Sequence, residues 1–357
     1  MSMQERPLVS VVTPVYNGAD FLADCMESVL KQTYKNLEYI IVNNCSTDRS
    51  LEIAEGYAPK DSRIRVHSNS SFVGVIENHN IAFGLISPAA KYCKVVSADD
   101  FLFPDCITRL VECAETHSSA GIVGSYQLSG ASVKWQGFDY PRSLLPGREL
   151  CRRIFLEGDP SFGFGTPTSL MYRADLVRSS GGFYPNPSPH ADTSACFKYL
   201  HDSDFGFVYQ VLSYERKHQQ TQSSTSAEMD RYSSAYLNDV IEYGPLYLNR
   251  EEVERKTGEV LGRYHRFLAA NWLMGFRGRE FWAYHEARLQ ELGHPLTRLA
   301  LLKAALITLL QESQNPGQAI RKFWKRAFPA PRPAKAVGTQ GLPGGHNRDC
   351  AKVEDAI

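Results

Sequence analysis

The sequence of 357 residues predicts an α/β protein whose mostly parallel sheet is flanked by helices. Two observations carry this prediction. In residues 1–125, short apolar runs rich in β-branched side chains alternate with stretches in which apolar side chains recur at helical spacing. The connections between them are short, and this order is typical of a parallel sheet with helices on both faces.

The predicted elements follow one another in regular order. Short apolar runs predict strands at residues 8–16, 37–44, 63–68, 92–97 and 121–129. Helical spacing predicts helices over residues 21–30, 51–54, 76–86 and 104–117. Ser46 or Thr47 can cap the second helix. Pro104 opens the last helix, where its missing N–H costs no hydrogen bond.

The pattern changes after residue 130. Residues 130–235 are rich in Gly, Pro, Ser and aromatic residues, which predicts long functional loops on the same sheet. A helical pattern follows, and the Pro- and Gly-rich C-terminus is predicted to be disordered. The predicted organisation is an α/β domain at 1–235, a helical extension at 236–328 and a disordered tail at 329–357.

Bulk composition narrows the class of protein. The 39 Lys and Arg residues balance the 39 Asp and Glu residues, so nothing indicates a nucleic-acid partner. The eight cysteines form no CxxC pair, which indicates free thiols in a reducing compartment. The N-terminus lacks the pattern of a secretory signal. The longest apolar run, at 299–310, is shorter than the about 20 residues that span a bilayer. We therefore expect a cytoplasmic protein.

The C-terminal region interleaves basic and aromatic residues. The sequence IRKFWKRAF, at 320–328, follows a Leu-rich helix at 296–310, and no acid lies between Glu312 and Asp349. This pattern is typical of an amphipathic element at the cytoplasmic face of a membrane. A helix docked on the α/β domain, with a basic outer face, is the alternative.

Polar residues collect at the carboxyl ends of the predicted strands, where parallel sheets bind ligands. They are Thr13, Tyr16 and Asn17 after the first strand, Asn43 and Asn44 after the second, and Asp99 and Asp100 after the fourth. Two adjacent carboxylates suit Mg²⁺ or Mn²⁺, which also bridges substrate phosphates. A solvated turn is the alternative. Because no phosphate-binding glycine loop is present, a diphosphate here would be neutralised mainly by a metal.

These segments resemble glycosyltransferase family 2, the inverting enzymes with a GT-A fold. The sequence VSVVTPVYNGADFLADCMESVLKQTYKNLEYIIVNNCSTDRS is similar to the family's opening, in which T/S-P-x-Y-N follows one strand and D-D-x-S-x-D ends the next. NIAFG and CKVVSADD resemble its N-x-G/A and D-x-D-D segments. The resemblance covers about residues 8–110 and 165–225, roughly half the chain. It implies a GT-A-like fold and a nucleotide-sugar donor.

The resemblance implies roles in donor binding. Tyr16, with Thr13 and Pro14 beside it, would pack on the uracil ring of a UDP-sugar. Asn44 stands where the family has an acid that binds the N3–H of the base; an amide oxygen also accepts that bond, without the charge. Asp99 would contact the donor ribose or sugar, or a metal-bound water.

The resemblance also implies a metal site and a diphosphate site. Asp100 would ligate Mn²⁺ or Mg²⁺, although Ser97 stands where many members have a further acid. Arg216 would bind the diphosphate, and His218 would complete the metal shell. A surface run of Arg, Lys and His is the alternative for the last two.

The general base of the family lies in an acidic segment at the start of a helix. In PHADTSACFKYL, Asp192 takes the position of the acid, and His190 and Ala191 precede it in place of the usual Glu. Asp192 would take the proton from an acceptor hydroxyl as that hydroxyl attacks the anomeric carbon. The alternative is that Asp192 only caps the helix.

The sequence therefore predicts a metal-dependent inverting glycosyltransferase. It would move a sugar from a nucleotide diphosphate, with UDP expected, to a hydroxyl of a glycan or lipid-linked glycan in cell-surface polysaccharide biosynthesis. A scaffold with the same fold and little or no turnover is the competing hypothesis, motivated by Asn43, Asn44 and Ser97 in place of acids. A sugar nucleotidyltransferase is disfavoured because no Gly-rich basic loop follows the first strand.

Overall fold

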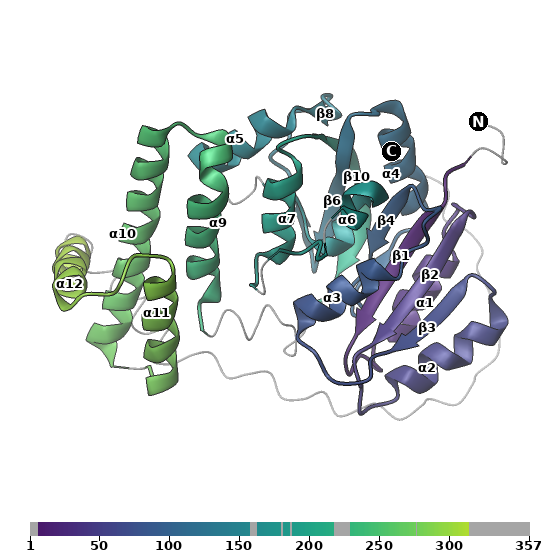
Figure 1. Cartoon of the computed structure of the whole chain (residues 1–357), viewed down its shortest axis with the longest axis horizontal. Coiled ribbons are helices and arrows are strands. Elements are labelled where there is room, and N and C mark those ends of the chain that lie inside the picture. Colours follow the sequence, from purple (N-terminus) through teal and green to yellow (C-terminus); the bar gives the residue numbers. More distant parts are fainter. Residues whose placement is uncertain are drawn as a thin grey trace, which may run out of the picture. The chain divides into compact units, whose positions relative to one another are not determined.

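The computed structural model describes residues 6–157, 163–179, 181–185, 188–217, 229–275 and 277–313. The chain divides into two compact units, Met1–Ala305 and Leu306–Ile357. The sheet and the helices that form the site all lie in the first unit (Figure 1). His218, the basic segment at 320–328 and the tail at 329–357 lie outside the described residues.

One sheet organises the first unit, in the strand order β3-β2-β1-β4-β9-β6-β10-β5, with β7 paired to β6 and β8 to β10. Its strands are β1 (Val9–Val15), β2 (Leu37–Asn43), β3 (Ile64–Ser68), β4 (Tyr92–Val95), β5 (Phe101–Leu102), β6 (Ala120–Ser129), β7 (Ser132–Lys134), β8 (Leu144–Leu145), β9 (Leu170–Arg173) and β10 (Asp204–Glu215). β1 to β4 run parallel, and so do β6 and β10. β9 lies antiparallel between β4 and β6.

Helices flank this sheet, and the mixed α/β fold with a mostly parallel sheet is confirmed. The helices of the described residues, the C-terminal ones included, are α1 (Leu22–Leu30), α2 (Ser50–Tyr57), α3 (Val75–Gly84), α4 (Cys106–Thr116), α5 (Gly147–Glu157), α6 (Ala174–Arg178), α7 (Ala191–Tyr199), α9 (Arg231–Tyr247), α10 (Arg250–Met274), α11 (Arg279–Glu291) and α12 (Arg298–Ser313), with 3₁₀ turns η2 (Ala58–Lys60) and η3 (Pro167–Ser169). Every strand and helix predicted for residues 1–125 is present. Within 130–235, the prediction of loops missed α5 and β10.

The predicted cap of the second helix is wrong. α2 begins at Ser50, and no side chain caps it from the N-cap residue, Arg49. Asp48 instead accepts a hydrogen bond from the backbone N–H of Ser50, at 2.9 Å. Ser46 accepts a bond from the backbone N–H of Asn17, at 3.0 Å, so this hydroxyl supports the turn after β1 and not the helix.

Two apolar clusters cover the two faces of the sheet. Val11 belongs to the cluster that includes Leu22 of α1 and Ile107 of α4. Val12, the next residue, belongs to the cluster that includes Phe83 of α3 and the aromatic residues of α5 and α7. This split follows from strand geometry, because successive side chains point to opposite faces.

The C-terminal helices share the second of these clusters. Phe155 of α5 stacks on Phe197 of α7, with ring centroids 4.3 Å apart, and Tyr247 of α9 donates a hydrogen bond to the Phe197 carbonyl. Arg152 of α5 pairs with Glu252 of α10. The predicted boundary between residues 235 and 236 falls within α9. The division into domains at this point stays a prediction.

Two further expectations concern membranes and cysteines. Among the described residues, no helix combines the length and apolarity needed to cross a bilayer. The cysteines within the described ranges are free thiols, as the sequence predicted. The basic segment that motivated a membrane-surface role lies outside these ranges, so that role stays a prediction.

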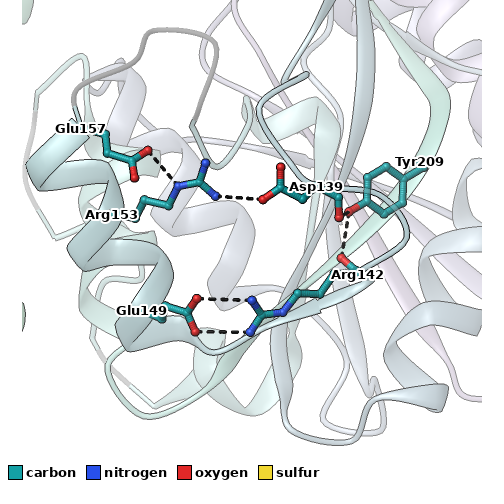
Figure 2. A network of polar contacts seen from close by, with 6 residues as sticks. All are labelled: Asp139, Arg142, Glu149, Arg153, Glu157 and Tyr209. Atoms are coloured by element: carbon teal, nitrogen blue, oxygen red, sulfur yellow. Dashed lines mark hydrogen bonds and ion pairs between the residues drawn. The ribbon is translucent and has the colours of Figure 1, made fainter.

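A polar network fastens the segment between β7 and β8 to α5 and β10. Figure 2 shows its members, Asp139, Arg142, Glu149, Arg153, Glu157 and Tyr209. Arg142 makes two bonds of 3.3 Å to Glu149 on α5. The Tyr209 hydroxyl donates to the carbonyl oxygens of Asp139, at 2.7 Å, and Arg142, at 2.9 Å. Backbone carbonyls held by a hydroxyl fix the segment more firmly than exposed ion pairs do.

Tyr209→Phe should therefore lower the free energy of unfolding by about 1 kcal/mol, the net value of a typical hydrogen bond. Arg142→Ala should cost less, because exposed ion pairs contribute about 0–1 kcal/mol. Urea denaturation of both variants and the unaltered protein measures the difference. A larger loss in Arg142→Ala than in Tyr209→Phe would contradict this ranking.

Candidate active site

A cavity of about 1290 Å³ lies at the carboxyl ends of β1, β2 and β4. Its wall gathers most of the residues that the sequence singled out: Pro14, Tyr16, Asn44, Asp99, Asp100, Asp192 and Arg216. Thr13 does not line it, and His218 lies outside the described residues. Residues far apart in the sequence thus meet at the edge of the sheet where parallel strands bind ligands.

Strand alternation keeps Thr13 away from the cavity. Its side chain is fully buried on the face of β1 that packs against α1. There its hydroxyl lies 3.0 Å from the hydroxyl of Tyr39. Pro14, one residue later, belongs to the cavity wall. The period of two along β1 therefore assigns Thr13 to the core, and the expected contact with a nucleotide has no support in the geometry.

Tyr16 is an exposed aromatic residue at the mouth of the cavity. Its ring is 49% exposed and meets Phe72 edge to face, with centroids 4.8 Å apart. The turn that follows is fixed by side chains from the β2–α2 connection. Asp48 accepts from the backbone N–H of Ala19 at 2.9 Å, and Ser50 accepts from that of Gly18 at 2.8 Å. A rigid turn holds the ring in the open, where a base can stack on it.

Asn44 is occupied by its own neighbourhood. Its Nδ2 donates to the Val73 carbonyl at 2.8 Å, and its Oδ1 accepts from the Val73 N–H and from Asn69, both at 3.0 Å. Both lone pairs of Oδ1 are therefore used, so the expected bond to a base N3–H would require one of these to break. The amide instead makes two hydrogen bonds to the backbone of Val73, one to its carbonyl and one from its N–H. A carboxylate could make only the second, because it has no donor.

Asp100 is buried at the base of the cavity and held by two donors. Its Oδ2 accepts from the Thr168 hydroxyl at 2.6 Å, and its Oδ1 accepts from the backbone N–H of Arg216 at 3.0 Å. Burial, and then the adjacent Asp99 carboxylate, raise the pKa of Asp100 to about 7. This carboxyl is thus fixed in place but costly to ionise unless a cation lies beside it.

A buried lysine fixes the turn that holds Asp100. Lys94 of β4 is fully buried, and its ammonium donates to the carbonyls of Thr168, Leu170 (2.9 Å) and Val95 (3.1 Å). Burial lowers the pKa of Lys94 to about 8. Sequence analysis missed Lys94 and Thr168; the available sign was a lysine inside the apolar run YCKVVS.

Arg216 places a cation next to the two acids. Its Nε donates to the Asp99 carbonyl at 3.0 Å, and its terminal nitrogen pairs with Asp24 at 3.2 Å. The guanidinium lies 4.8 Å from the ring centroid of Phe21. Because Arg216 also lines the cavity, it can meet an anionic ligand there.

The pair Asp99 and Asp100 fits a divalent cation. Carboxylate oxygens are the donors that Mg²⁺ and Mn²⁺ prefer, and a cation would relieve the repulsion that raises the pKa of Asp100. Within the described ranges, no three His, Cys, Asp or Glu side chains are grouped to hold a metal. The donor set therefore suits an ion held by one or two carboxylates together with substrate phosphates.

Asp192 lies in the first turn of α7. It is far from Asp99 and Asp100 in the sequence but lines the same cavity. The N-cap residue of α7 is His190, so Asp192 does not occupy the N-cap position, although its side chain does bind a backbone N–H of the first turn. Its Oδ1 accepts from the Thr193 N–H at 2.8 Å. Burial raises the pKa of Asp192, which brings the carboxylate closer to the basicity that a general base needs.

A second ionisable group beside Asp192 was missed by sequence analysis. His190 also lines the cavity, and its Nδ1 lies 3.0 Å from Asp239 of α9. Asp239 also accepts from the Ser194 hydroxyl at 2.6 Å. No local pattern links residues 49 positions apart, so only the fold reveals this pair.

Asp100→Asn should reveal the cost of the buried carboxylate. The pKa of Asp100 is about 7 in the folded protein and near the ordinary 3.8 in the unfolded chain, so the folded state holds the proton more tightly between these values. The contribution of Asp100 to the stability of the unaltered protein therefore falls as pH rises from about 4 to 7. In metal-free buffer at pH 8, Asp100→Asn should be more stable, by on the order of 2–4 kcal/mol.

Thermal melts at pH 4.5, 6 and 8 with a chelator measure this difference, which should shrink toward low pH. Glu55→Gln, at an exposed carboxyl of α2, is the control and should show no such trend. Lower stability of Asp100→Asn than of the unaltered protein at pH 8 would show that Asp100 is not a strained anion.

Comparisons with known proteins agree with this fold. Residues 10–181 match the family model described as glycosyl transferase family 2. An uncharacterised glycosyltransferase of Haemophilus influenzae is 36% identical over 124 residues, which are 35% of this chain and 38% of that protein. This chain therefore aligns with less than half the length of that relative.

Two solved structures show the same fold at low sequence identity. TarS 1–349 of S. aureus, in complex with UDP-GlcNAc, has 18% identity and a TM-score of 0.56 over 80% of each chain. The mannosyltransferase PcManGT of Pyrobaculum calidifontis, in complex with GDP-Man and Mn²⁺, has 13% identity and a TM-score of 0.51 over 87% of this chain and 89% of that one. The sheet and its helices thus form a GT-A fold, and residues 10–181, just under half of the chain, match glycosyltransferase family 2.

Proposed function

We propose that the protein is a metal-dependent inverting glycosyltransferase that moves a sugar from a nucleotide diphosphate, with UDP preferred, to a hydroxyl of a glycan or lipid-linked glycan. One observation carries the proposal: a single cavity gathers an exposed aromatic ring, two adjacent carboxylates, an arginine and a carboxylate of raised pKa. The nucleotide sugars bound by TarS and PcManGT support a donor of this class.

The donor end of the cavity is formed by the turns after β1 and β4. Tyr16 offers its ring face to the base, and Phe72 extends the aromatic surface. Arg216 faces the diphosphate with its guanidinium. Asp100 and Asp99 would hold Mn²⁺ or Mg²⁺, which would supply positive charge to neutralise the diphosphate. Asn44 contributes by holding the loop at residues 69–73 closed.

The acceptor end is formed by α7. Asp192 accepts the proton of the acceptor hydroxyl while the oxygen of that hydroxyl forms a bond to the anomeric carbon. The bond from that carbon to the diphosphate breaks at the same time, and its electron pair leaves with the diphosphate. Because attack and departure occur on opposite faces, one displacement inverts the configuration of the anomeric carbon.

The acceptor and the location follow from the family resemblance and the sequence, and not from the cavity. If the acceptor is lipid-linked, the protein would work at the cytoplasmic face of the membrane, in cell-surface polysaccharide biosynthesis. A nucleotide-sugar-binding scaffold without turnover is the competing function. It is favoured by Asn44, whose amide oxygen already accepts two hydrogen bonds, and by Ser97, which stands in place of an acid.

Nucleotide binding should depend on the metal and on Asp100. With Mn²⁺ present, UDP-GlcNAc or another nucleoside diphosphate sugar should raise the melting temperature, since a ligand at 100 times its Kd stabilises by about 2.7 kcal/mol. Asp100→Ala should abolish the part of this shift that requires Mn²⁺. A panel of uridine, thymidine and guanosine diphosphate sugars, with Mn²⁺ or a chelator, measures it. No shift with any member would count against the donor site.

Turnover should depend on Asp192 while donor binding does not. Asp192→Asn keeps the shape of the side chain but removes its basicity, so release of nucleoside diphosphate should fall by about 10²–10⁴-fold. The thermal shift caused by donor and Mn²⁺ should stay unchanged. Asp202→Asn, an exposed substitution, serves as the control. Donor binding without release in every variant, including the unaltered protein, would favour the scaffold.

A further inference from the structure

His190 is placed for chemistry that the proposed function has not used. It is the N-cap residue of α7, two positions before Asp192, and both residues line the cavity. Its side chain is 20% exposed, whereas its partner Asp239 is 1% exposed. One end of the imidazole is thus anchored in the protein interior while the residue itself forms part of the cavity wall.

The anchor determines which ring nitrogen carries the proton. Asp239 Oδ1 accepts from the Ser194 hydroxyl at 2.6 Å, and Asp239 Oδ2 lies 3.0 Å from His190 Nδ1. A carboxylate offers only acceptors, so Nδ1 of the neutral ring carries the hydrogen in this contact. Nε2 then holds the lone pair. The same logic orients a histidine base wherever a buried carboxylate lies behind it.

The surroundings keep the pair in this arrangement. The rings of Tyr232 and Tyr236, on α9, lie 5.5 and 6.4 Å from the imidazole, centroid to centroid. Burial raises the pKa of Asp239, and the bonds from His190 and Ser194 oppose that rise. The nearest acid on the helix of His190 itself is Asp192, whose pKa is raised mainly by burial.

We propose that His190, oriented by Asp239, is a second general base at the acceptor end of the cavity, so that the attacking hydroxyl lies between two proton acceptors. This inference rests on the proposed glycosyl transfer. When His190 takes the proton in place of Asp192, the O–H bond of the nucleophile breaks and its proton binds Nε2. The oxygen forms its bond to the anomeric carbon as the diphosphate leaves with the electron pair, and Asp239 stabilises the imidazolium.

Asp239→Asn tests the proposal with little change in shape. If the amide oxygen of Asn keeps the Ser194 bond, its NH₂ group faces Nδ1, which must then accept, so the proton moves to Nε2 and the lone pair is lost. With UDP-GlcNAc or GDP-Man as donor, Mn²⁺, and water as nucleophile, kcat for nucleotide release should fall about 10²-fold, near the lower limit for a general base because Asp192 remains. The KM for the donor should stay unchanged.

Two further variants separate catalysis from folding. His190→Gln replaces a partly exposed ring by a side chain without basicity and should lose kcat to the same extent. Tyr247→Phe removes another α9-to-α7 hydrogen bond, the one to the Phe197 carbonyl, far from the chemistry assigned here. It should lower stability with kcat retained. Equal losses of kcat in Tyr247→Phe and Asp239→Asn would show a purely structural role and overturn the proposal.

A measurement without turnover completes the test. Nitrogen-15 NMR of the histidine ring should report an unprotonated Nε2 in the unaltered protein and a protonated Nε2 in Asp239→Asn. The opposite assignment in the unaltered protein would overturn the proposal directly. Equal kcat in the unaltered protein and Asp239→Asn would overturn this inference alone. Absence of release by the unaltered protein with every donor would overturn the glycosyltransferase proposal, and with it the second base.

Discussion

The ammonium of Lys94 is the contact on which the geometry of the site depends. A cation buried in an apolar sheet is unfavourable unless polar partners surround it. Here the partners are backbone carbonyls from β4 itself, from the turn η3 and from the first residue of β9. The lysine therefore joins β4 to an antiparallel neighbour at the point where Thr168 reaches Asp100. Without it, these carbonyls would be left without their donor, and Thr168 would lose the support that places its hydroxyl.

The two acids at the end of β4 are unequal because their surroundings differ. Asp100 is buried and bound by Thr168 and by the backbone of Arg216, so its position is fixed and its ionised form is disfavoured. Asp99 is less buried, and its carbonyl holds the guanidinium of Arg216. Asp100 is thus fixed by Thr168 and by the backbone after β10, and Asp99, the preceding residue, holds the arginine that is expected to face phosphate. Adjacent like charges at a strand end make sense when a cationic ligand completes the set.

What the sequence could predict follows from how local each signal is. Apolar side chains recur with a period of two in strands and 3.6 in helices, and these patterns involve only neighbouring residues. The strands and helices of residues 1–125, and the edge of the sheet where Asp99 and Asp100 lie, could therefore be predicted from the sequence. The alternation of side chains along β1 could also be predicted, and it places Thr13 in the core. The family motif nevertheless suggested that Thr13 contacts the nucleotide, and the structure shows it beside Tyr39 instead. The roles of Asn44 and His190 were not accessible. They depend on Val73 and Asp239, whose positions follow from tertiary packing and not from any nearby pattern.

Asn44 also has a consequence for the ligands that this cavity admits. The amide of Asn44 is bonded to Val73 and Asn69, and both lone pairs of its oxygen are used in these bonds. In this arrangement the oxygen cannot also accept a hydrogen bond from a nucleobase. Discrimination among bases would then rest on the size and stacking of the ring against Tyr16 and Phe72. If the cavity binds the donor as proposed, a preference for uridine would come from the fit of the base against these two rings and not from a hydrogen bond to the Oδ1 of Asn44.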